Sequence, residues 1–395
     1  MNKNLWLLAV AQGLFLTNNV TFIAINGLVG LSLAPLGWMA TLPVMGYVVG
    51  GALSTGLVAK TQARWGRKVS FQLGLAVALC SALLGAWAVA HQNFWLLVTA
   101  TLVAGYYSAN GQLYRFAAAE LALPAFREKA VSLVLAGGLM GAVAGPNLAS
   151  RTRTLTEVPF AGAYLALAVV ALLAMAVMAL VQFPPAAPPT VGADGKVDEG
   201  RPLGVLLRQP VFMVAAGAAA LSYGVMNLLM AATPLAMQVC GFPFDDAALV
   251  LEWHVIGMFA PGFFTGHLIK RFGTLPIMGV GVLLYALCIG IALSGQDLHQ
   301  FLVALLLLGV GWNFLFTGST TLAMQAYRPA EKDRAQAAIN FGVFATMAFT
   351  SFASGALVTT QGWALLNLGS LLPVALTALG LGWLGWLRRN TARPN

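Results

Sequence analysis

Four possible metal ligands stand close together in the second half of the chain: Met226 and Met230, then His254 and Met258. Each pair is spaced i, i+4, so on a helix its two side chains project from one face, about one turn apart. Thioether sulfur and neutral imidazole are soft ligands without fixed charge, which suit Cu(I) better than a hard cation. The four residues therefore predict a copper site, provided that the two helices lie side by side.

The segments that carry the two pairs are hydrophobic enough to be consecutive membrane spans, which run antiparallel. In an antiparallel pair, residues at equal depth have position numbers with a constant sum. Met226 with Met258 and Met230 with His254 give equal sums, so we expect both pairs to lie level. A single methionine in an apolar helix is usually packing material. A histidine inside a span is rare and usually functional, so His254 strengthens the metal hypothesis.

The composition is that of a membrane protein. The chain of 395 residues is 59% hydrophobic and only 8% charged, whereas a soluble domain has roughly 25% charged residues. A membrane span needs about 20 apolar residues. We predict an all-α membrane protein with twelve transmembrane helices near residues 5–27, 37–59, 69–90, 94–116, 131–150, 161–182, 211–233, 247–268, 276–295, 300–322, 338–358 and 363–387.

The basic residues predict the orientation. If both termini are cytoplasmic, only Arg151 and Arg153 lie on the opposite side, and Arg115 lies within a span or at its end. All other lysines and arginines then face the cytoplasm, as the positive-inside rule requires. The net charge of +9 is thus explained by topology and anionic membrane lipid, with no nucleic-acid partner. We expect a multi-pass protein of the bacterial inner membrane.

The two halves of the chain echo each other around a central linker. Residues 183–210 begin with four closely spaced prolines and divide the chain into bundles of six spans at 1–182 and 211–395. The short connection with Arg64-Trp65-Gly66-Arg67-Lys68 has a counterpart at 266–273, and Glu120 to Lys129 has one at 328–334. Two pseudo-symmetric repeats of six spans are the plan of a rocking secondary transporter.

On these features the chain resembles the major facilitator superfamily over its whole length. Gly66-Arg67-Lys68 looks like the end of that family's gating motif, G-x-x-x-D-R-x-G-R-R/K. The acidic position of the motif is Ala63 and its leading glycine is Ala59, so its charge relay is incomplete. Gly141-Ala-Val-Ala-Gly145-Pro146 resembles the glycine–proline motif of proton-coupled exporters, or serves close helix packing with a kink.

Within that superfamily, the two pairs resemble the CcoA-type copper importers of Gram-negative bacteria. The resemblance implies import of copper, as Cu(I), by alternating access for the assembly of haem–copper oxidases. It implies copper as the transported substrate with no resident cofactor, a monomer, and copper chaperones or periplasmic thiol oxidoreductases as partners. RfnT-like proteins of the same broader group are linked to riboflavin uptake, so riboflavin or another organic solute is the alternative cargo.

Residues near the two pairs have two interpretations each. Asp245 or Asp246 either caps the eighth span or attracts cations to an entrance where Met237 or Cys240 is a first ligand. Glu252 either carries a coupling proton beside His254 or is interfacial. In an occluded state, a further donor such as Met39, Met45 or an amide of the first span would approach copper.

Other spans carry polar side chains that either line a central cavity or bond neighbouring helices, at about 1 kcal/mol each. Amides and aromatic rings of this kind are also what a flavin or drug pocket would use. No role in proton coupling is assigned to the arginine among them. The residues are Gln12, Thr17, Asn18, Asn19, Asn26, Asn110, Gln112, Tyr114, Arg115, Glu120, Trp312, Asn313, Thr317 and Asn340.

The sequence does not predict an enzyme. It has no Walker A motif for ATP, and Cys80, Cys240 and Cys288 form no C-x-x-C pair. Three kinds of function remain: a Cu(I) importer, an organic-solute carrier for riboflavin or a drug:proton antiporter, and a non-transporting sensor or assembly factor on a transporter scaffold. The glycine–proline motif suggests export and the subfamily suggests import, so the direction stays open.

Overall fold

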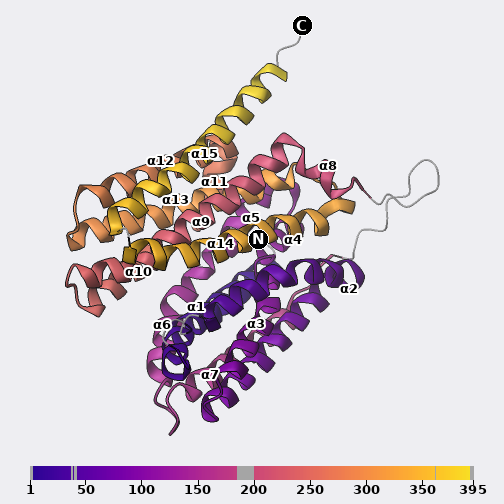
Figure 1. Cartoon of the computed structure of the whole chain (residues 1–395). Coiled ribbons are helices and arrows are strands. Elements are labelled where there is room, and N and C mark those ends of the chain that lie inside the picture. The colour runs from indigo at the N-terminus through magenta and orange to yellow at the C-terminus, as the bar shows by residue number, and fades with distance from the viewer. Residues whose placement is uncertain (1–2, 37–38, 40–41, 185–199, 361, 392–395) are drawn as a thin grey trace. The chain divides into compact units, whose positions relative to one another are not determined.

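The computed structural model describes residues 3–36, 39, 42–184, 200–360 and 362–391. Within these ranges all regular structure is helical (Figure 1). The chain forms two compact units: unit 1 comprises residues 1–126, 133–188 and 336–344, and unit 2 comprises residues 127–132, 189–335 and 345–395. The predicted boundaries at 182 and 211 stay a prediction.

The helices of unit 1 are α1 (Lys3–Leu33), α2 (Leu42–Ala90), α3 (Phe94–Gly111), α4 (Tyr114–Leu121), the end of α5 (Arg127–Ala136), α6 (Gly138–Thr152) and α7 (Ala161–Leu180); residues 127–132 of α5 belong to unit 2. Those of unit 2 are α8 (Leu203–Leu207), α9 (Pro210–Val239), α10 (Phe244–Phe259), α11 (Gly262–Phe272), α12 (Thr274–Ser294), α13 (Leu298–Met324) and α15 (Gly362–Thr391). The helix α14 (Lys332–Thr360) contributes to both units, because residues 336–344 pack with unit 1.

The all-α fold class is confirmed, with differences at the ends of several predicted spans. Among the described residues, eight helices are long and apolar enough to cross a membrane individually. The predicted spans fall largely on helix: residues 37–38 and 40–41 lie outside the described part, and residues 181–182 and 295 lie beyond the ends of α7 and α12. Spans two and three are joined in α2, which turns at Gly66 with a φ of 78° that favours glycine.

Three predicted spans are each divided into two helices. The fourth is divided at Gln112–Leu113 and the fifth at Gly137. The eighth ends as α10 and restarts as α11 after Ala260 and Pro261. Proline has no backbone N–H to donate to the preceding turn, which explains the break in the eighth span.

Polar side chains bond the helices of unit 1 to each other. Asn18 Nδ2 donates to the Leu167 carbonyl over 3.2 Å, and the Tyr164 hydroxyl donates to Asn26 Oδ1 over 2.8 Å. Asn19 Nδ2 donates to the Tyr47 hydroxyl over 2.7 Å. For these residues the structure favours the second interpretation of the polar set, interhelical bonding, which satisfies groups that lipid cannot solvate.

The arginine of the incomplete gating motif is held within unit 1. Arg67 is buried and its Nη2 lies 2.6 Å from Glu120 Oε1 and 2.6 Å from Gln336 Oε1. It also donates to Gln62 Oε1. Glu120, at the end of α4, therefore supplies the negative charge that Ala63 does not.

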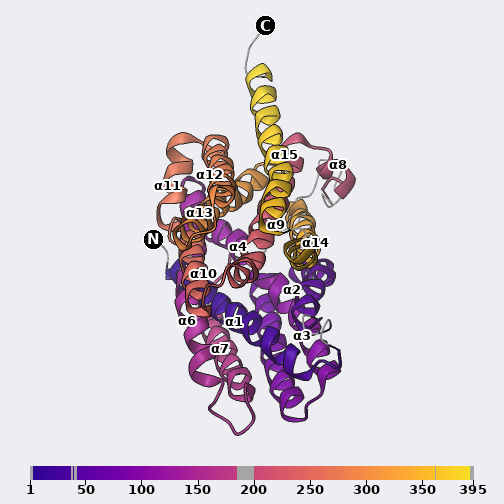
Figure 2. The ribbon, with the colours of Figure 1, turned by 60° about the vertical axis from the view of Figure 1, so that its left-hand side comes forward.

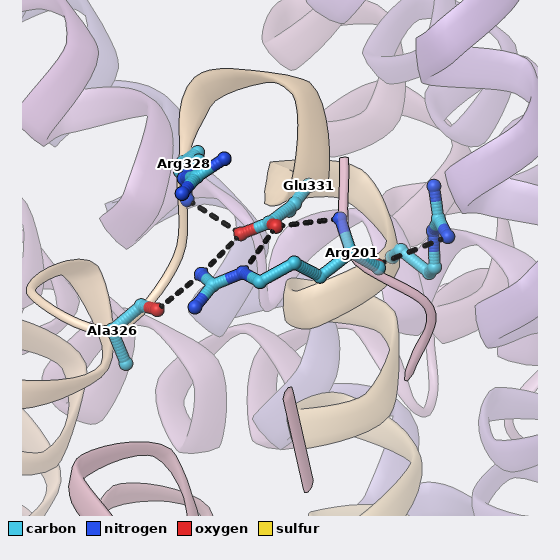
Figure 3. A network of polar contacts seen from close by, with 5 residues as sticks. Arg201, Ala326, Arg328 and Glu331 are labelled. Atoms are coloured by element: carbon cyan, nitrogen blue, oxygen red, sulfur yellow. Dashed lines mark hydrogen bonds and ion pairs between the residues drawn. The ribbon is translucent and has the colours of Figure 1, made fainter. Parts of the chain in front are cut away.

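A second glutamate is buried where α13 is joined to α14 in unit 2 (Figure 3). Glu331 is fully buried and accepts from Arg201 Nε and Nη2, each over 2.6 Å. It also accepts from the backbone N–H groups of Arg201 and Arg328. Arg201 Nη2 continues to the Ala326 carbonyl over 3.0 Å. Arg201, which lies within the predicted linker 183–210, is thus bonded to the α13–α14 connection.

The side-chain bonds from Arg201 hold the pKa of Glu331 at about 2, below its ordinary value of 4.5. Glu331 is therefore ionised in both folded and unfolded chains above about pH 5, where its stabilising effect is complete. As pH falls from about 5 towards 2, the unfolded chain takes up the proton first and the stabilisation is lost.

We expect Arg201→Gln to lower the free energy of unfolding by about 2–3 kcal/mol at neutral pH, because the buried carboxylate keeps only its backbone donors. Glu331→Gln should remove the loss of stability between about pH 5 and 3. Thermal unfolding in detergent measures both effects, and Arg208→Gln, at an exposed position just after α8, is the control. Equal unfolding temperatures for wild type and Arg201→Gln would contradict this account.

Candidate metal centre and aromatic cluster

The four predicted ligands lie on neighbouring helices of unit 2 (Figure 2). Met226 and Met230 belong to α9, and His254 and Met258 belong to α10, which contacts α9 and packs extensively on α13. Met226, His254 and Met258 are buried, and Met230 is half-buried. Each pair is therefore on one helix, as the spacing indicates. That the four donor atoms converge on one ion stays a prediction.

The imidazole of His254 is arranged as a metal ligand would be. It is fully buried, and its Nδ1 lies 2.8 Å from the Leu305 carbonyl oxygen of α13. A carbonyl oxygen only accepts, so Nδ1 carries the proton and Nε2 of the neutral ring has a free lone pair. Nε2 has no hydrogen-bond partner among the described residues. A backbone carbonyl on one ring nitrogen and metal on the other is a common arrangement for histidine ligands.

The helix α13 holds α10 by two further contacts. A Cβ built on Gly309 would lie only 2.8 Å from the Met258 nitrogen, so the two backbones approach more closely than any larger residue permits. Asn313 Nδ2 donates to the Met258 carbonyl over 2.7 Å, and Thr265 Oγ1 donates to Asn313 Oδ1 over 2.7 Å. The amide of Asn313 therefore forms hydrogen bonds to neighbouring helices of unit 2.

The donors around His254 are soft. No group of three or more His, Cys, Asp or Glu side chains gathers anywhere in the described part of the chain. A site at His254 would therefore draw on the thioethers of α9 and α10. Such a set suits Cu(I) and fits hard cations such as Mg²⁺ or Ca²⁺ poorly.

The structure also places the residues that were predicted to lie near the two pairs. The prediction that Asp245 or Asp246 caps the eighth span is wrong in position, because Pro243 is the N-cap of α10 and both acids lie in its first turn. Met237 is fully buried and Cys240 is exposed, with its Sγ 3.2 Å from Gln296 Oε1. That one of the two is a first ligand at an entrance stays a prediction.

Glu252 lies on the opposite side of α10 from the buried imidazole. Its side chain is exposed, whereas His254 is fully buried. Residues two positions apart on a helix do not face each other. The geometry thus gives no direct path for a proton between Glu252 and His254.

A cluster of aromatic rings surrounds Trp312 of α13. Its ring stacks on Phe316 at 4.7 Å between centroids and meets the edges of Tyr223 and Phe259, at 5.5 and 5.8 Å. Trp312 is buried, and within the described ranges its Nε1 has no hydrogen-bond acceptor. Tyr223 is half-buried. Sequence reasoning found Trp312 but missed the other three rings, although the i, i+4 spacing of Trp312 and Phe316 is a readable signal.

The arginine of the predicted polar set contacts two neighbouring side chains. Arg115 is buried in α4, its Nη2 lies 3.3 Å from Asn340 Oδ1, and its guanidinium stands over the Phe116 ring. Two polar groups of unit 1, Gln12 Oε1 and the Tyr107 hydroxyl, have no partner in the described structure. Groups of this kind need a substrate, water or a second conformation to satisfy them.

Comparison with known proteins decides the family. The family model for the Major Facilitator Superfamily matches residues 5–261 and 218–395, almost the whole chain. The chain belongs to the Major Facilitator Superfamily. It is therefore a multi-pass membrane protein and a secondary transporter, with the family's plan of twelve transmembrane helices in two bundles. This superfamily is a family of transporters and not of enzymes.

Two relatives of the chain differ in whether their transported substrate is named. The chain is 39% identical over 368 residues to a Brucella anthropi protein named riboflavin transporter RfnT, covering 92% of this chain and 91% of the relative. It is 26% identical to an uncharacterised transporter of the superfamily from Bacillus subtilis, YddS, over 86% of this chain and 81% of the relative. The first relative favours the riboflavin alternative over copper import, and neither relative is named for copper.

Solved structures confirm the fold alone. A bacterial homologue of the iron transporter ferroportin matches with a TM-score of 0.76, at 15% identity over 96% of this chain and 98% of that one. The transporter FucP matches with a TM-score of 0.78 at the same identity and coverage.

Proposed function

We propose that this transporter takes up a solute across the bacterial inner membrane by alternating access, with both termini in the cytoplasm, and that its cargo is riboflavin or a related flavin. The observation that carries the cargo is the 39% identity to the riboflavin transporter over 92% of the chain. The distribution of basic residues supports the orientation, and the absence of a Walker A motif from the sequence supports a secondary mechanism.

The aromatic cluster offers chemistry that suits a flavin. An isoalloxazine ring is flat and apolar on its faces, and its edge carries carbonyl oxygens and ring nitrogens that accept hydrogen bonds. Tyr223 presents a half-buried ring to such a face, and Trp312 Nε1 is a donor in need of an acceptor. We propose that these two side chains contact the flavin.

Expression of the chain should restore riboflavin uptake to bacteria that neither make nor import it. Tyr223→Ala should raise the KM for riboflavin about fivefold, because an aromatic contact contributes about 1 kcal/mol beyond its buried area. Uptake of radiolabelled riboflavin measures this, and Phe263→Ala, at an exposed ring of α11, is the control. Uptake no faster than in cells with an empty vector would contradict the flavin proposal.

Cu(I) is the second candidate cargo, and the geometry of His254 favours it. His254 is a buried imidazole whose Nδ1 is bonded to a carbonyl and whose Nε2 has no partner among the described residues. Leaving Nε2 unpaired destabilises the fold, and a bound metal ion would satisfy it. Met226, Met230 and Met258 are the thioethers that the same two helices can offer. If copper is the cargo, copper chaperones or thiol oxidoreductases that reach the exposed Cys240 would be its partners.

We expect the purified protein to bind about one Cu(I) per chain, because the donor set is soft and uncharged. Replacing Met226, Met230, His254 and Met258 together by alanine should abolish binding, as titration against a Cu(I) chelator measures. Two methionine controls outside the pairs are Met213→Ala, exposed on α9, and Met278→Ala, buried on α12. Wild-type affinity in the quadruple variant would exclude the site.

A double variant, Met226→Ala with Met230→Ala, separates the two cargoes, because it leaves the crossing of α10 and α13 unchanged. A flavin carrier should keep riboflavin uptake without the thioethers, whereas a copper importer should lose copper uptake. Measuring both uptakes in the same cells assigns the cargo.

A further inference from the structure

One face of α13 contacts the imidazole of His254 and the backbone of the turn that carries Met258, while the neighbouring Leu306 and Val310 lie against Gly257. The residues of that face are Leu305, Gly309 and Asn313, spaced i, i+4 and i+8. They meet α10 at His254, at Gly257–Met258 and at Met258 in turn. The same helical period that places His254 and Met258 on one side of α10 thus recurs on α13.

The first contact fixes the state of the imidazole. The Leu305 carbonyl is a helical oxygen, and its second lone pair accepts from His254 Nδ1 over 2.8 Å. This bond holds the proton on Nδ1 and sets the plane of the ring. Without it, a neutral imidazole can move its proton to Nε2, and a protonated Nε2 cannot bind a metal.

The second contact sets the distance between the two helices. A Cβ on Gly309 would collide with the His254 carbonyl and would lie 2.8 Å from the Met258 nitrogen and 3.0 Å from the Gly257 carbonyl carbon. All three are backbone atoms, which no change of side-chain rotamer can move away. A residue larger than glycine therefore has to push α10 and α13 apart, which lengthens the bond from His254 to Leu305.

The third contact holds the end of α10. The Met258 carbonyl lies in the last turn of the helix, where carbonyls have no helical partner. Asn313 Nδ2 donates to it, and Thr265 Oγ1 on Asn313 Oδ1 fixes which way the amide faces. The turn that carries Met258 is thereby held against α13 even though the chain breaks at Pro261.

We infer that Leu305, Gly309 and Asn313 are positioning residues for a soft-metal ligand set on α10. The Leu305 carbonyl selects the form of His254 that is protonated on Nδ1. Gly309 sets the distance between the helices that this bond needs, and Asn313 holds the turn that carries Met258. This inference rests on the second cargo candidate, Cu(I). None of the three side chains is itself proposed to touch the metal.

The test reads the proton on His254 directly and without copper. His91, His267 and His299 are exposed, so replacing all three by glutamine leaves His254 as the only histidine. In this background, ¹⁵N spectra of histidine-labelled protein distinguish a protonated from an unprotonated ring nitrogen. We expect a single form with the proton on Nδ1, and we expect Gly309→Ala to convert it to a mixture or to the other form.

Copper affinity should change in parallel. Gly309→Ala and Asn313→Leu should each weaken Cu(I) binding about 10- to 100-fold, the usual effect of losing a group that orients a ligand. Two glycines of α12 are controls: Gly290→Ala meets open space, and Gly281→Ala meets the Gly311 oxygen at 2.9 Å where α12 crosses α13. Both controls should keep the wild-type histidine spectrum and affinity.

The inference is overturned if Gly309→Ala keeps the Nδ1-protonated form, or if Gly281→Ala shifts the spectrum equally. If Gly309→Ala fails to fold, Asn313→Leu decides by its copper affinity. The two proposals fail separately. A wild type with the expected spectrum that binds no Cu(I) excludes copper and leaves the positioning intact. A wild type that binds Cu(I) with a mixed spectrum excludes the positioning alone.

Discussion

The close crossing of α10 and α13 at Gly309 is the constraint on which the candidate metal centre depends. Because Gly309 has no side chain, the two backbones approach until a helical carbonyl meets a buried imidazole. The bond satisfies one ring nitrogen of His254 and leaves the other with a free lone pair. A buried polar group without a hydrogen-bond partner destabilises a membrane protein. The free Nε2 of His254 therefore points to a functional role for this side chain.

The same need to satisfy polar groups applies to two glutamates: Glu120 at the end of α4 and Glu331 just before α14. Each is paired with an arginine at 2.6 Å. Glu120 is partly exposed and lies on α4, whereas Glu331 is fully buried in the connection after α13. The arginines come from different parts of the chain: Arg67 follows the turn in α2, and Arg201 lies near the end of the central linker. In unit 2 this makes the end of the linker part of the packed structure.

Much of the fold follows from the sequence, because a membrane span needs only length and low polarity. The apolar runs place the predicted spans largely on helix, and the i, i+4 pairs put Met226 with Met230 and His254 with Met258. The breaks at Gln112–Leu113 and Ala260–Pro261 were missed, since an interrupted helix buried in protein has the same hydropathy as a continuous one. The partner of His254 could not be predicted, because Leu305 contributes a backbone oxygen and residue type carries no information about it. Gly309 is one of 43 glycines, and nothing local separates it from the rest.

The relatives and the geometry point to different cargoes, and the physical origin of the difference is local. The identity of 39% over 92% of the chain is an average over all aligned positions. Cargo depends on a few side chains, so substitution of a handful of residues can change it without altering that identity. Unit 2 holds both kinds of chemistry within one region, because Phe259 follows Met258 directly and meets Trp312, whose neighbour Asn313 bonds the Met258 carbonyl. A change in the crossing of α10 and α13 would therefore disturb an aromatic contact and a metal ligand together. The thioethers of α9 lie outside that shared crossing, which makes them the side chains that separate the two cargoes most cleanly.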